Sequence, residues 1–415
     1  MTKSLYICYF GMREPLVQTQ VIPYLKELVK GGVSVSLLTF EPDLKKKWTS
    51  VEIEERRAEL AAEGIDWHCL AYHKRPSVPA TLYDIFAGAW KVRGMLKAEK
   101  FDILHCRVHV PMLMGALARK FSGRRPKLLF DIRGFFPEEF VDAGIWKQDS
   151  LVYRGVKQVE KWLMKEADGF VVLTETARQI LFPESEQSCL DKHLRPIEVI
   201  PCCVDLDRFS LATAETRLKM RTELNLGDRF VLAYVGAFGG WYLTDEMADF
   251  YRVTKEKYKD AFALILTQSD PEMIRQKLNA AGYSDKDVFI RQVNSAEIPV
   301  YLSAADAALS FIKPSYSKKS SSPTKNAEYL ACGVPIIANP GVGDVDEMIK
   351  ENGVGVLIEE FTATAYGKAL TDLEDLGSIG ENCRDVARRE FDLHEIGGSK
   401  YRHLYHRLGA ALTER

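Results

Sequence analysis

Residues 313–343 read KPSYSKKSSSPTKNAEYLACGVPIIANPGVG and contain a loop, a helix and a strand in succession. The small polar residues 320–324 predict the loop, and Pro323 fits the first turn of the helix that follows. Gly333 ends this helix, and the apolar run 334–338 predicts a buried strand. A succession of this kind is one repeat of an α/β fold.

Similar units recur along the chain, and their strands form two series. The first series is predicted at 5–10, 33–40, 103–105, 128–132, 169–173 and 197–200, with a helix at 17–30. The second is predicted at 230–235, 262–266, 288–290, 307–310, 334–338 and 354–357. Strands separated by helix-length connections pair in parallel. The sequence therefore predicts an α/β protein with two successive doubly wound domains.

The sequence also indicates where each of these domains begins and ends. The stretch 201–209 ends the first series, and a charged helical stretch at 215–224 leads into the second. We therefore expect an N-terminal domain at 1–205 and a C-terminal domain at 206–394. A last helix at 395–415 is expected to pack back on the first domain.

Composition excludes several classes of protein. The 415 residues carry 56 Lys and Arg against 58 Asp and Glu, so no overall basic field favours nucleic-acid binding. No apolar run reaches the length of a membrane span, and the N-terminus lacks a secretory signal. The 8 cysteines are scattered without a CxxC pair, which is typical of reduced thiols. We expect a cytoplasmic protein; contact with the inner face of the membrane is left open.

The loop before the helix has the chemistry of an anion site. Backbone N–H groups and the positive end of the helix dipole would face a ligand above residues 320–324. Lys325 adds a positive charge, and Lys319 precedes the loop. Glu328 follows one turn after Thr324, where a carboxylate can accept hydrogen bonds from a vicinal diol such as a ribose. The alternative interpretation is a capped helix with solvated charges.

The same residues carry a resemblance to a known family. The pattern Pro323-Thr324-Lys325-x-x-Glu328-Tyr329-Leu330-Ala331-x-Gly333-Val334-Pro335 resembles the nucleotide-sugar site of glycosyltransferase family 4. The resemblance extends through both predicted domains, with Asp205-x-x-Arg208-Phe209 similar to the family's interdomain signature. It implies the GT-B fold, in which two doubly wound, Rossmann-like domains face a cleft. It also implies a retaining reaction, a nucleotide-diphosphate sugar as donor, and no cofactor or metal.

The sequence also departs from the family pattern at three places. Ser320 stands where the family commonly has the first of two glutamates. The residues that follow Gly236 include neither of the two cations that commonly serve the diphosphate there, so Lys325, Lys319 and Arg13 are the candidates to replace them. Arg133 stands where a histidine is common, and a guanidinium cannot act as a base.

The segment 134–146 follows a first-domain strand and combines aromatic with acidic residues. We interpret it as a loop that binds a polyol acceptor, because carboxylates accept hydroxyl hydrogen bonds and rings cover a sugar face. A domain-packing loop is the alternative.

The candidate site residues follow from the resemblance and from this local chemistry. Those predicted to bind the nucleotide sugar are Gly11, Arg13, Gly236, Lys319, Ser320, Ser322, Thr324, Lys325 and Glu328. Those predicted to act in catalysis are Arg133, Lys325 and Glu138. Those predicted to contact the acceptor are His105, Arg107, Glu138 and Glu139.

Metal sites are not favoured. His105 and His109 lack an acidic partner between them on a helix, and the aspartate pairs at 205–207 and 344–346 lie beside turns.

The resemblance implies transfer of a sugar to a hydroxyl acceptor, which could be lipid-linked, an oligosaccharide or a small molecule. A sugar-nucleotide epimerase and a non-catalytic nucleotide-sugar-binding protein are the alternatives.

Overall fold

The computed structural model describes residues 1–413, with side chains as far as Gly409, and the chain divides into two compact units. Unit 1 comprises Met1–Pro201 together with the C-terminal segment from Leu393 onward, and unit 2 comprises Cys202–Asp392. The observed divisions lie within a few residues of the boundaries expected after residues 205 and 394.

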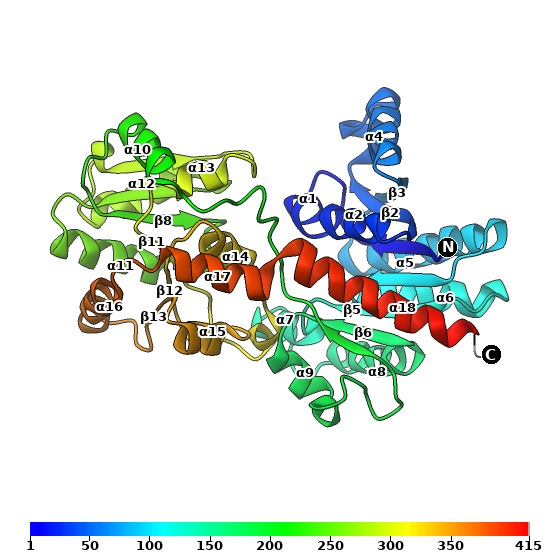
Figure 1. Cartoon of the computed structure of the whole chain (residues 1–415). Helices are drawn as coiled ribbons and strands as arrows, with labels where there is room; N and C mark the ends of the chain where they lie inside the picture. The colour runs from blue at the N-terminus through cyan, green and yellow to red at the C-terminus, as the bar shows by residue number, and fades with distance from the viewer. Residues whose placement is uncertain (414–415) are drawn as a thin grey trace. The chain divides into compact units, whose positions relative to one another are not determined.

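Unit 1 is built on a seven-stranded parallel sheet with the order β3-β2-β1-β4-β5-β6-β7 (Figure 1). Its strands are β1 Lys3–Cys8, β2 Ser34–Pro42, β3 Ile65–Tyr72, β4 Ile103–Arg107, β5 Lys127–Ile132, β6 Gly169–Val172 and β7 Ile197–Val199. Strand β3 was not among the predicted strands, because its sequence IDWHCLAY mixes polar with apolar residues. Its register with β2 begins at Val35 opposite Ile65.

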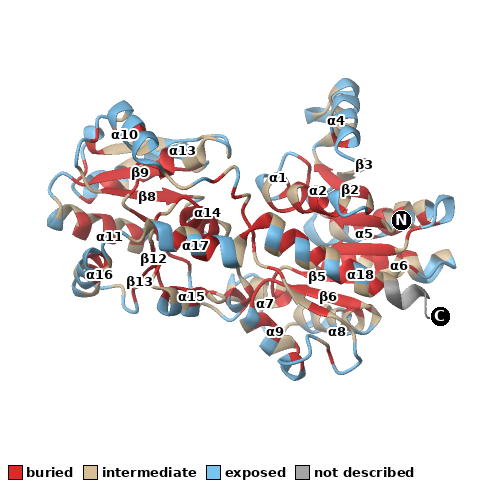
Figure 2. Cartoon of the chain, in the orientation of Figure 1, coloured by how far each residue is buried: buried red, intermediate tan, exposed pale blue. Residues whose placement is uncertain are grey.

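Helices cover this sheet. They are α1 Pro15–Gln20, α2 Ile22–Lys30, α3 Leu44–Lys47, α4 Ser50–Ala62, α5 Ser77–Ala98, α6 His109–Ser122, α7 Phe136–Asp142, α8 Leu151–Glu166, α9 Glu175–Leu181 and the short η1 Pro183–Ser185. The helix predicted at 17–30 is in fact two helices, because Val21 leaves helical geometry and Pro23 starts the second. Most of α4 is exposed, in contrast to the buried strands (Figure 2).

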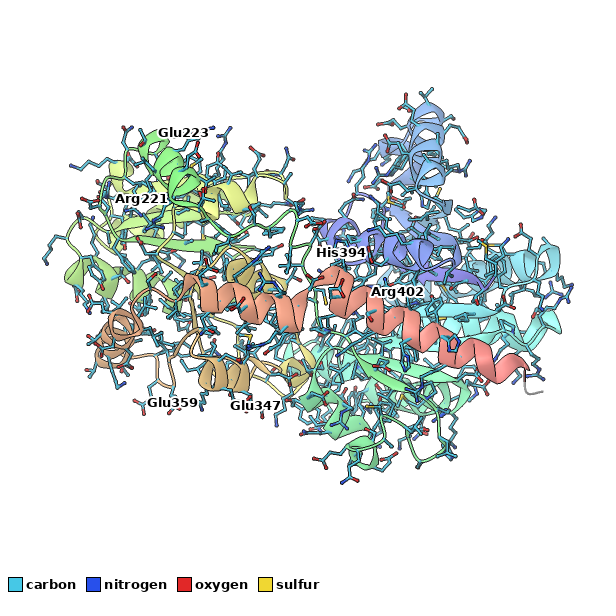
Figure 3. All side chains as sticks on the ribbon, viewed as in Figure 1. Arg221, Glu223, Glu347, Glu359, His394 and Arg402 are labelled. Atoms are coloured by element: carbon cyan, nitrogen blue, oxygen red, sulfur yellow. The ribbon has the colours of Figure 1, made fainter. Side chains whose placement is uncertain are left out.

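The C-terminal segment belongs to unit 1. It consists of a π-helical turn, η4 Leu393–Gly398, and helix α18 Ser399–Thr413. The buried Glu27 of α2 accepts hydrogen bonds from Arg402 at 3.0 Å and from His394 at 2.8 Å, two residues labelled in Figure 3. Tyr405 lies 2.9 Å from Ser4 of β1. The segment therefore closes the core of unit 1.

Unit 2 contains a six-stranded parallel sheet with the order β10-β9-β8-β11-β12-β13. Its strands are β8 Val231–Val235, β9 Phe262–Leu266, β10 Val288–Arg291, β11 Ala307–Ser310, β12 Ile336–Ala338 and β13 Gly355–Leu357. Its helices are α10 Ala214–Glu223, α11 Thr244–Lys257, α12 Pro271–Ala280, η2 Asp285–Asp287, α13 Ile298–Leu302, η3 Ser317–Ser320, α14 Thr324–Ala331, α15 Val345–Asn352, α16 Ala363–Leu376 and α17 Gly380–Phe391. Apolar clusters fill both faces of this sheet.

The predicted pair of doubly wound parallel α/β units is confirmed. In each sheet the strand order reverses at one point, between β1 and β4 in unit 1 and between β8 and β11 in unit 2. Ligands of open parallel sheets bind outside the carboxyl ends of the strands at such points. Within residues 1–413, no helix combines the length and apolarity that crossing a bilayer requires.

Candidate active site

The unit 2 site begins where β8 ends. Gly236 follows this strand with φ of 137°, which is a backbone conformation that L side chains rarely adopt. A Cβ atom at this position would lie 3.0 Å from Lys325 Nζ and 3.5 Å from the Tyr234 hydroxyl. Glycine is therefore needed at position 236 for two reasons, the backbone geometry and the close approach of the lysine.

Lys325 lies in an aromatic cage. Its Nζ is 4.2 Å from the centroids of both the Tyr234 and the Tyr242 rings. The side chain is buried, and among the described residues Nζ has no hydrogen-bond partner. A buried cation without a hydrogen-bond partner is costly, even where aromatic faces stabilise it. The amine of Lys325 lies beside Gly236, where the sequence lacks a cation directly after β8.

Burial perturbs both ionisable groups of α14. It lowers the pKa of Lys325 to about 7, although the carboxylate of Glu328 opposes this shift. It raises the pKa of Glu328 to about 7, against the opposing charges of Arg208 and Lys325. Perturbed groups of this kind are typical of functional sites. Both groups would gain from a ligand that brings a counter-charge or hydrogen bonds to this place.

The loop before α14 is held by its own hydrogen bonds. Ser320 lies in η3 and donates to the Ser317 carbonyl at 2.7 Å, and Ser322 Oγ accepts from the Cys202 amide at 3.1 Å. Pro323 is the N-cap residue, so the helix starts one residue later than predicted, at Thr324. The two predicted serine ligands thus shape the loop. Their backbone, together with the α14 N-terminus, remains the better candidate to contact an anion.

The structure adds residues that sequence reasoning missed. Lys318 is buried with its Nζ 4.0 Å from the Trp241 ring, whereas the predicted Lys319 is exposed. Both side-chain amide atoms of the buried Asn326 lack a hydrogen-bond partner among the described residues. Arg208 faces Glu328 electrostatically. Two of these residues had a sequence signal: Arg208 lies in the pattern Asp205-x-x-Arg208-Phe209, and Lys318 precedes the loop beside Lys319.

Unit 1 contains a cavity of about 340 Å³ near the point where its strand order reverses. It is lined by Tyr9, Phe10, Leu16, Arg107, Val108, Val110, Pro111, Arg133, Gly134, Phe136, Glu139 and Phe140. Three of the predicted residues, Arg107, Arg133 and Glu139, therefore share one cavity. Val108 has φ of 68°, a strained value for a β-branched residue, which is typical of functional sites.

A buried charge cluster lies beneath this cavity. Arg107 and Arg133 each approach an oxygen of Asp131 at 3.8 Å, and Tyr401 donates to Asp131 at 3.1 Å. Burial alone would raise the pKa of Asp131, but the cations and His105 hold it at about 2. His105 does not line the cavity: it is buried, and it contacts the Tyr405 hydroxyl at 2.9 Å. Its predicted contact with the acceptor is replaced by a packing role.

Two further predictions are met differently by the structure. The segment 134–146 is not a loop, because Phe136–Asp142 form α7. Glu138 on this helix pairs with Lys157 at 2.9 Å and accepts from the Tyr153 hydroxyl at 3.1 Å, so it holds α7 against α8. Glu139, the next residue, is the one that lines the cavity.

The predicted phosphate contacts of unit 1 are placed outside this cavity. Arg13 pairs with Glu52 at 2.8 Å and lies 4.1 Å from the Trp48 ring centroid, so its guanidinium stabilises the exposed α3–α4 region. A Cβ atom at Gly11 would lie 2.6 Å from Pro42 Cδ, which explains the glycine by packing.

The candidate metal residues have other partners. His109 pairs with Glu160 at 2.9 Å and stacks on Phe136. In the aspartate pairs, Asp205 accepts from the Asp207 amide at 3.0 Å, and Asp346 accepts from the Gly341 amide at 3.0 Å. These are contacts within turns and loops, and Asp344, the N-cap residue of α15, makes no side-chain capping hydrogen bond.

Comparison with known proteins agrees with this arrangement. The family description "Glycosyl transferases group 1" matches residues 216–390, and "Glycosyltransferase Family 4" matches residues 17–208. A 2-deoxystreptamine glucosyltransferase of Streptomyces kanamyceticus is 26% identical over 273 residues, which span 63% of this chain and 66% of that protein. The UDP-Gal:alpha-D-GlcNAc-diphosphoundecaprenol alpha-1,3-galactosyltransferase of Escherichia coli is 25% identical over 312 residues, which span 72% of this chain and 74% of that protein.

The fold is shared with solved structures. The sucrose-phosphate synthase of Thermosynechococcus elongatus superposes with a TM-score of 0.71 at 18% identity, covering 99% of this chain and 100% of that one. Two parallel α/β units of this architecture define the GT-B class of glycosyltransferases. The chain belongs to the group 1, family 4 glycosyltransferases, and the resemblance seen in the sequence is confirmed.

Proposed function

We propose that this enzyme transfers a sugar, with retention of anomeric configuration, from a nucleotide-diphosphate sugar bound by unit 2 to a hydroxyl group of an acceptor bound by unit 1. The single observation that carries the donor assignment is the buried Lys325 ammonium, which has no hydrogen-bond partner among the described residues. A diphosphate placed beside it would supply the missing counter-charge.

The chemistry of the donor site follows from its groups. Negative charge on the diphosphate grows as the glycosidic bond breaks, so Lys325 and the α14 N-terminus would stabilise the transition state more than the bound donor. Glu328 is proposed to accept hydrogen bonds from the ribose diol. Gly236 leaves the space in which lysine and diphosphate would meet.

The cavity of unit 1 is proposed to hold the acceptor. The rings of Phe10, Phe136 and Phe140 supply apolar faces, and Glu139 supplies a carboxylate that can accept hydroxyl hydrogen bonds. Retention is explained if the leaving diphosphate deprotonates the acceptor hydroxyl and the new bond forms on the same face of the sugar. The proposed reaction uses no metal, so a chelator is expected to leave turnover unchanged.

The first test is a thermal-shift screen of nucleoside diphosphates and their sugars. The two relatives named above are a glucosyltransferase and a galactosyltransferase, so hexose donors come first. A ligand at 100 times its dissociation constant should stabilise the protein by about 2.7 kcal/mol. Lys325→Ala should abolish this shift, whereas the matched control Lys319→Ala, at an exposed lysine of the same segment, should retain it.

The outcomes separate the possible activities. Transfer to an acceptor, or slow hydrolysis of the donor without one, supports the proposal. An isomerised donor would identify an epimerase instead. Stabilisation by nucleotide sugars without turnover would indicate a binding protein, and absence of any stabilisation would overturn the donor assignment.

A further inference from the structure

Helix α5 presents an apolar face to solvent. Val78, Leu82, Tyr83, Phe86 and Trp90 are exposed to 58%, 49%, 62%, 66% and 71%. Four of these residues are spaced four apart, so they form one stripe along the helix. We call these five residues the α5 face. The opposite side of the same helix is buried against unit 1.

The α5 face continues onto the end of α6. Phe121 is 63% exposed, and its carbonyl accepts a hydrogen bond from Arg93 Nε at 2.9 Å. The Arg93 guanidinium lies 4.9 Å from the Trp90 ring centroid, so Arg93 joins the two helices. Exposed apolar residues that cluster in this way mark an interaction surface, whereas scattered ones do not.

Positive charge surrounds the apolar stripe. Between residues 74 and 97 the basic residues are Lys74, Arg75, Lys91, Arg93 and Lys97. The only acidic residue there is Asp84, which is fully buried and accepts hydrogen bonds from Tyr9 and His73. In the neighbouring stretch 119–127, Arg119 pairs with Glu166 and Asp168, and Lys127 pairs with Asp168, so the exposed cations there are Lys120, Arg124 and Arg125. The surface is therefore apolar at its centre and cationic at its margins, in a chain whose net charge is −2.

We propose that the α5 face binds the surface of a bilayer that contains anionic lipids, with α5 lying in the headgroup region. The aliphatic and phenyl side chains enter the acyl boundary, and the lysines and arginines contact lipid phosphates. Tryptophan and tyrosine are the residues enriched at this depth of a membrane. The complementarity between the cationic margins and an anionic leaflet favours lipid over an uncharged protein partner.

This surface is linked to the acceptor cavity. The Tyr9 hydroxyl donates to Asp84 of α5 at 2.7 Å, and Tyr9 also lines the cavity. Asp84 is on the buried side of α5, so the cavity lining and the α5 face lie on opposite sides of one helix. An acceptor attached to a lipid could then reach the cavity from the bilayer; this last step rests on the proposed function.

The test uses the whole protein without donor, so that its result does not depend on catalysis. Sedimentation with phosphatidylcholine vesicles, with and without phosphatidylglycerol, should show binding only to the anionic vesicles and release by high salt. Phe86→Ser with Trp90→Ser should weaken binding at least about tenfold. Lys91→Glu with Lys97→Glu should weaken binding to the vesicles that contain phosphatidylglycerol.

The control is Leu218→Ser on α10, where a leucine is exposed to 68% outside the α5 face. It should bind vesicles like the unmodified protein. A melting temperature close to that of the unmodified protein would show that each variant is folded. Equal vesicle binding by the Phe86→Ser/Trp90→Ser variant would overturn the proposal. So would a dimer in ultracentrifugation that this variant dissociates, because the α5 face would then bind a second copy.

Discussion

Replacing Lys325 with methionine should make the ligand-free protein more stable while impairing its activity. At pH 7.5 the unfolded chain protonates this lysine, with a pKa of 10.5, whereas burial lowers the folded pKa to about 7. Folding at pH 7.5 therefore removes a proton from a group whose unfolded pKa is three units higher than the pH. At 1.36 kcal/mol per pH unit, this lowers the free energy of unfolding by about 4 kcal/mol. Methionine keeps a similar apolar volume without an ionisable group.

Part of that gain is offset. Methionine loses the contacts of Nζ with the Tyr234 and Tyr242 rings and the attraction to Glu328. We expect a net stabilisation of about 2 kcal/mol, which raises the melting temperature of a domain of this size by about 4–8 °C. The gain should shrink as the pH rises from about 7 towards 10.5. Over this range folding must remove a proton that the unfolded chain holds, and this removal costs less at each higher pH.

The same substitution should remove the donor's counter-charge. Turnover should fall by about 10²-fold or more, the usual effect of losing one group that stabilises developing negative charge. Nucleoside-diphosphate affinity, measured by calorimetry, should fall as well. The matched control is Lys319→Met, which changes an exposed lysine of the same segment and should leave stability and turnover near their original values.

Two results would refute this reasoning. A Lys325→Met protein that melts at a lower temperature would show that the buried ammonium stabilises the fold. Unchanged nucleoside-diphosphate affinity would show that no anion binds beside Lys325. In that case Lys318, which is buried against Trp241, is the next residue to test.

Further expectations concern the same two sites. At pH 8, binding of a nucleoside diphosphate should take up a proton, because the anion restores the charge of Lys325. Calorimetry in buffers of different ionisation enthalpy measures this proton uptake, and Lys325→Met should abolish it. Glu328→Ala should weaken binding of nucleotide sugars by about 1.5–3 kcal/mol, and equal affinity for the 2′,3′-dideoxynucleotide would remove the ribose assignment. Gly236→Ala should prevent donor binding, since its Cβ would meet Lys325 Nζ at 3.0 Å; full activity would show that the loop can move aside. Glu139→Gln should raise the Michaelis constant for the acceptor and leave donor hydrolysis unchanged. Glu138→Gln should lower the melting temperature without changing that Michaelis constant. The reverse pattern would restore Glu138 as the acceptor ligand.

Much of the fold could be predicted from the sequence, because it depends on the order of helices and strands along the chain. Alternation of apolar strands with helix-length connections predicts parallel sheets wherever it occurs, and the two sheets are present. The errors fell where local signals conflict. Strand β3 carries polar residues, Val21 interrupts a helix of apolar periodicity, and α7 has an aromatic and acidic sequence that resembles a binding loop.

The site was predictable in part for the same reason. Thr324, Lys325 and Glu328 lie within one and a half turns of a single helix, so their proximity follows from sequence spacing alone. Glu138 and Glu139 are adjacent in the sequence, yet one pairs with Lys157 and the other lines a cavity. Which of two neighbouring carboxylates faces a ligand depends on the helix packed against them, and sequence spacing does not contain that information.

By itself, then, the sequence determined the family, the two α/β units and the helix that carries the proposed donor residues, because each depends on patterns contained in short stretches of chain. Tertiary structure alone decided the environment of those residues. The cage of Lys325 comes from Tyr234 and Tyr242, which lie on a distant strand and the loop after it, and burial by these distant groups sets its pKa. Helix α5 is apolar on both sides, so its sequence resembles a buried helix. Only the folded unit shows which side the core covers and which side is left for a partner.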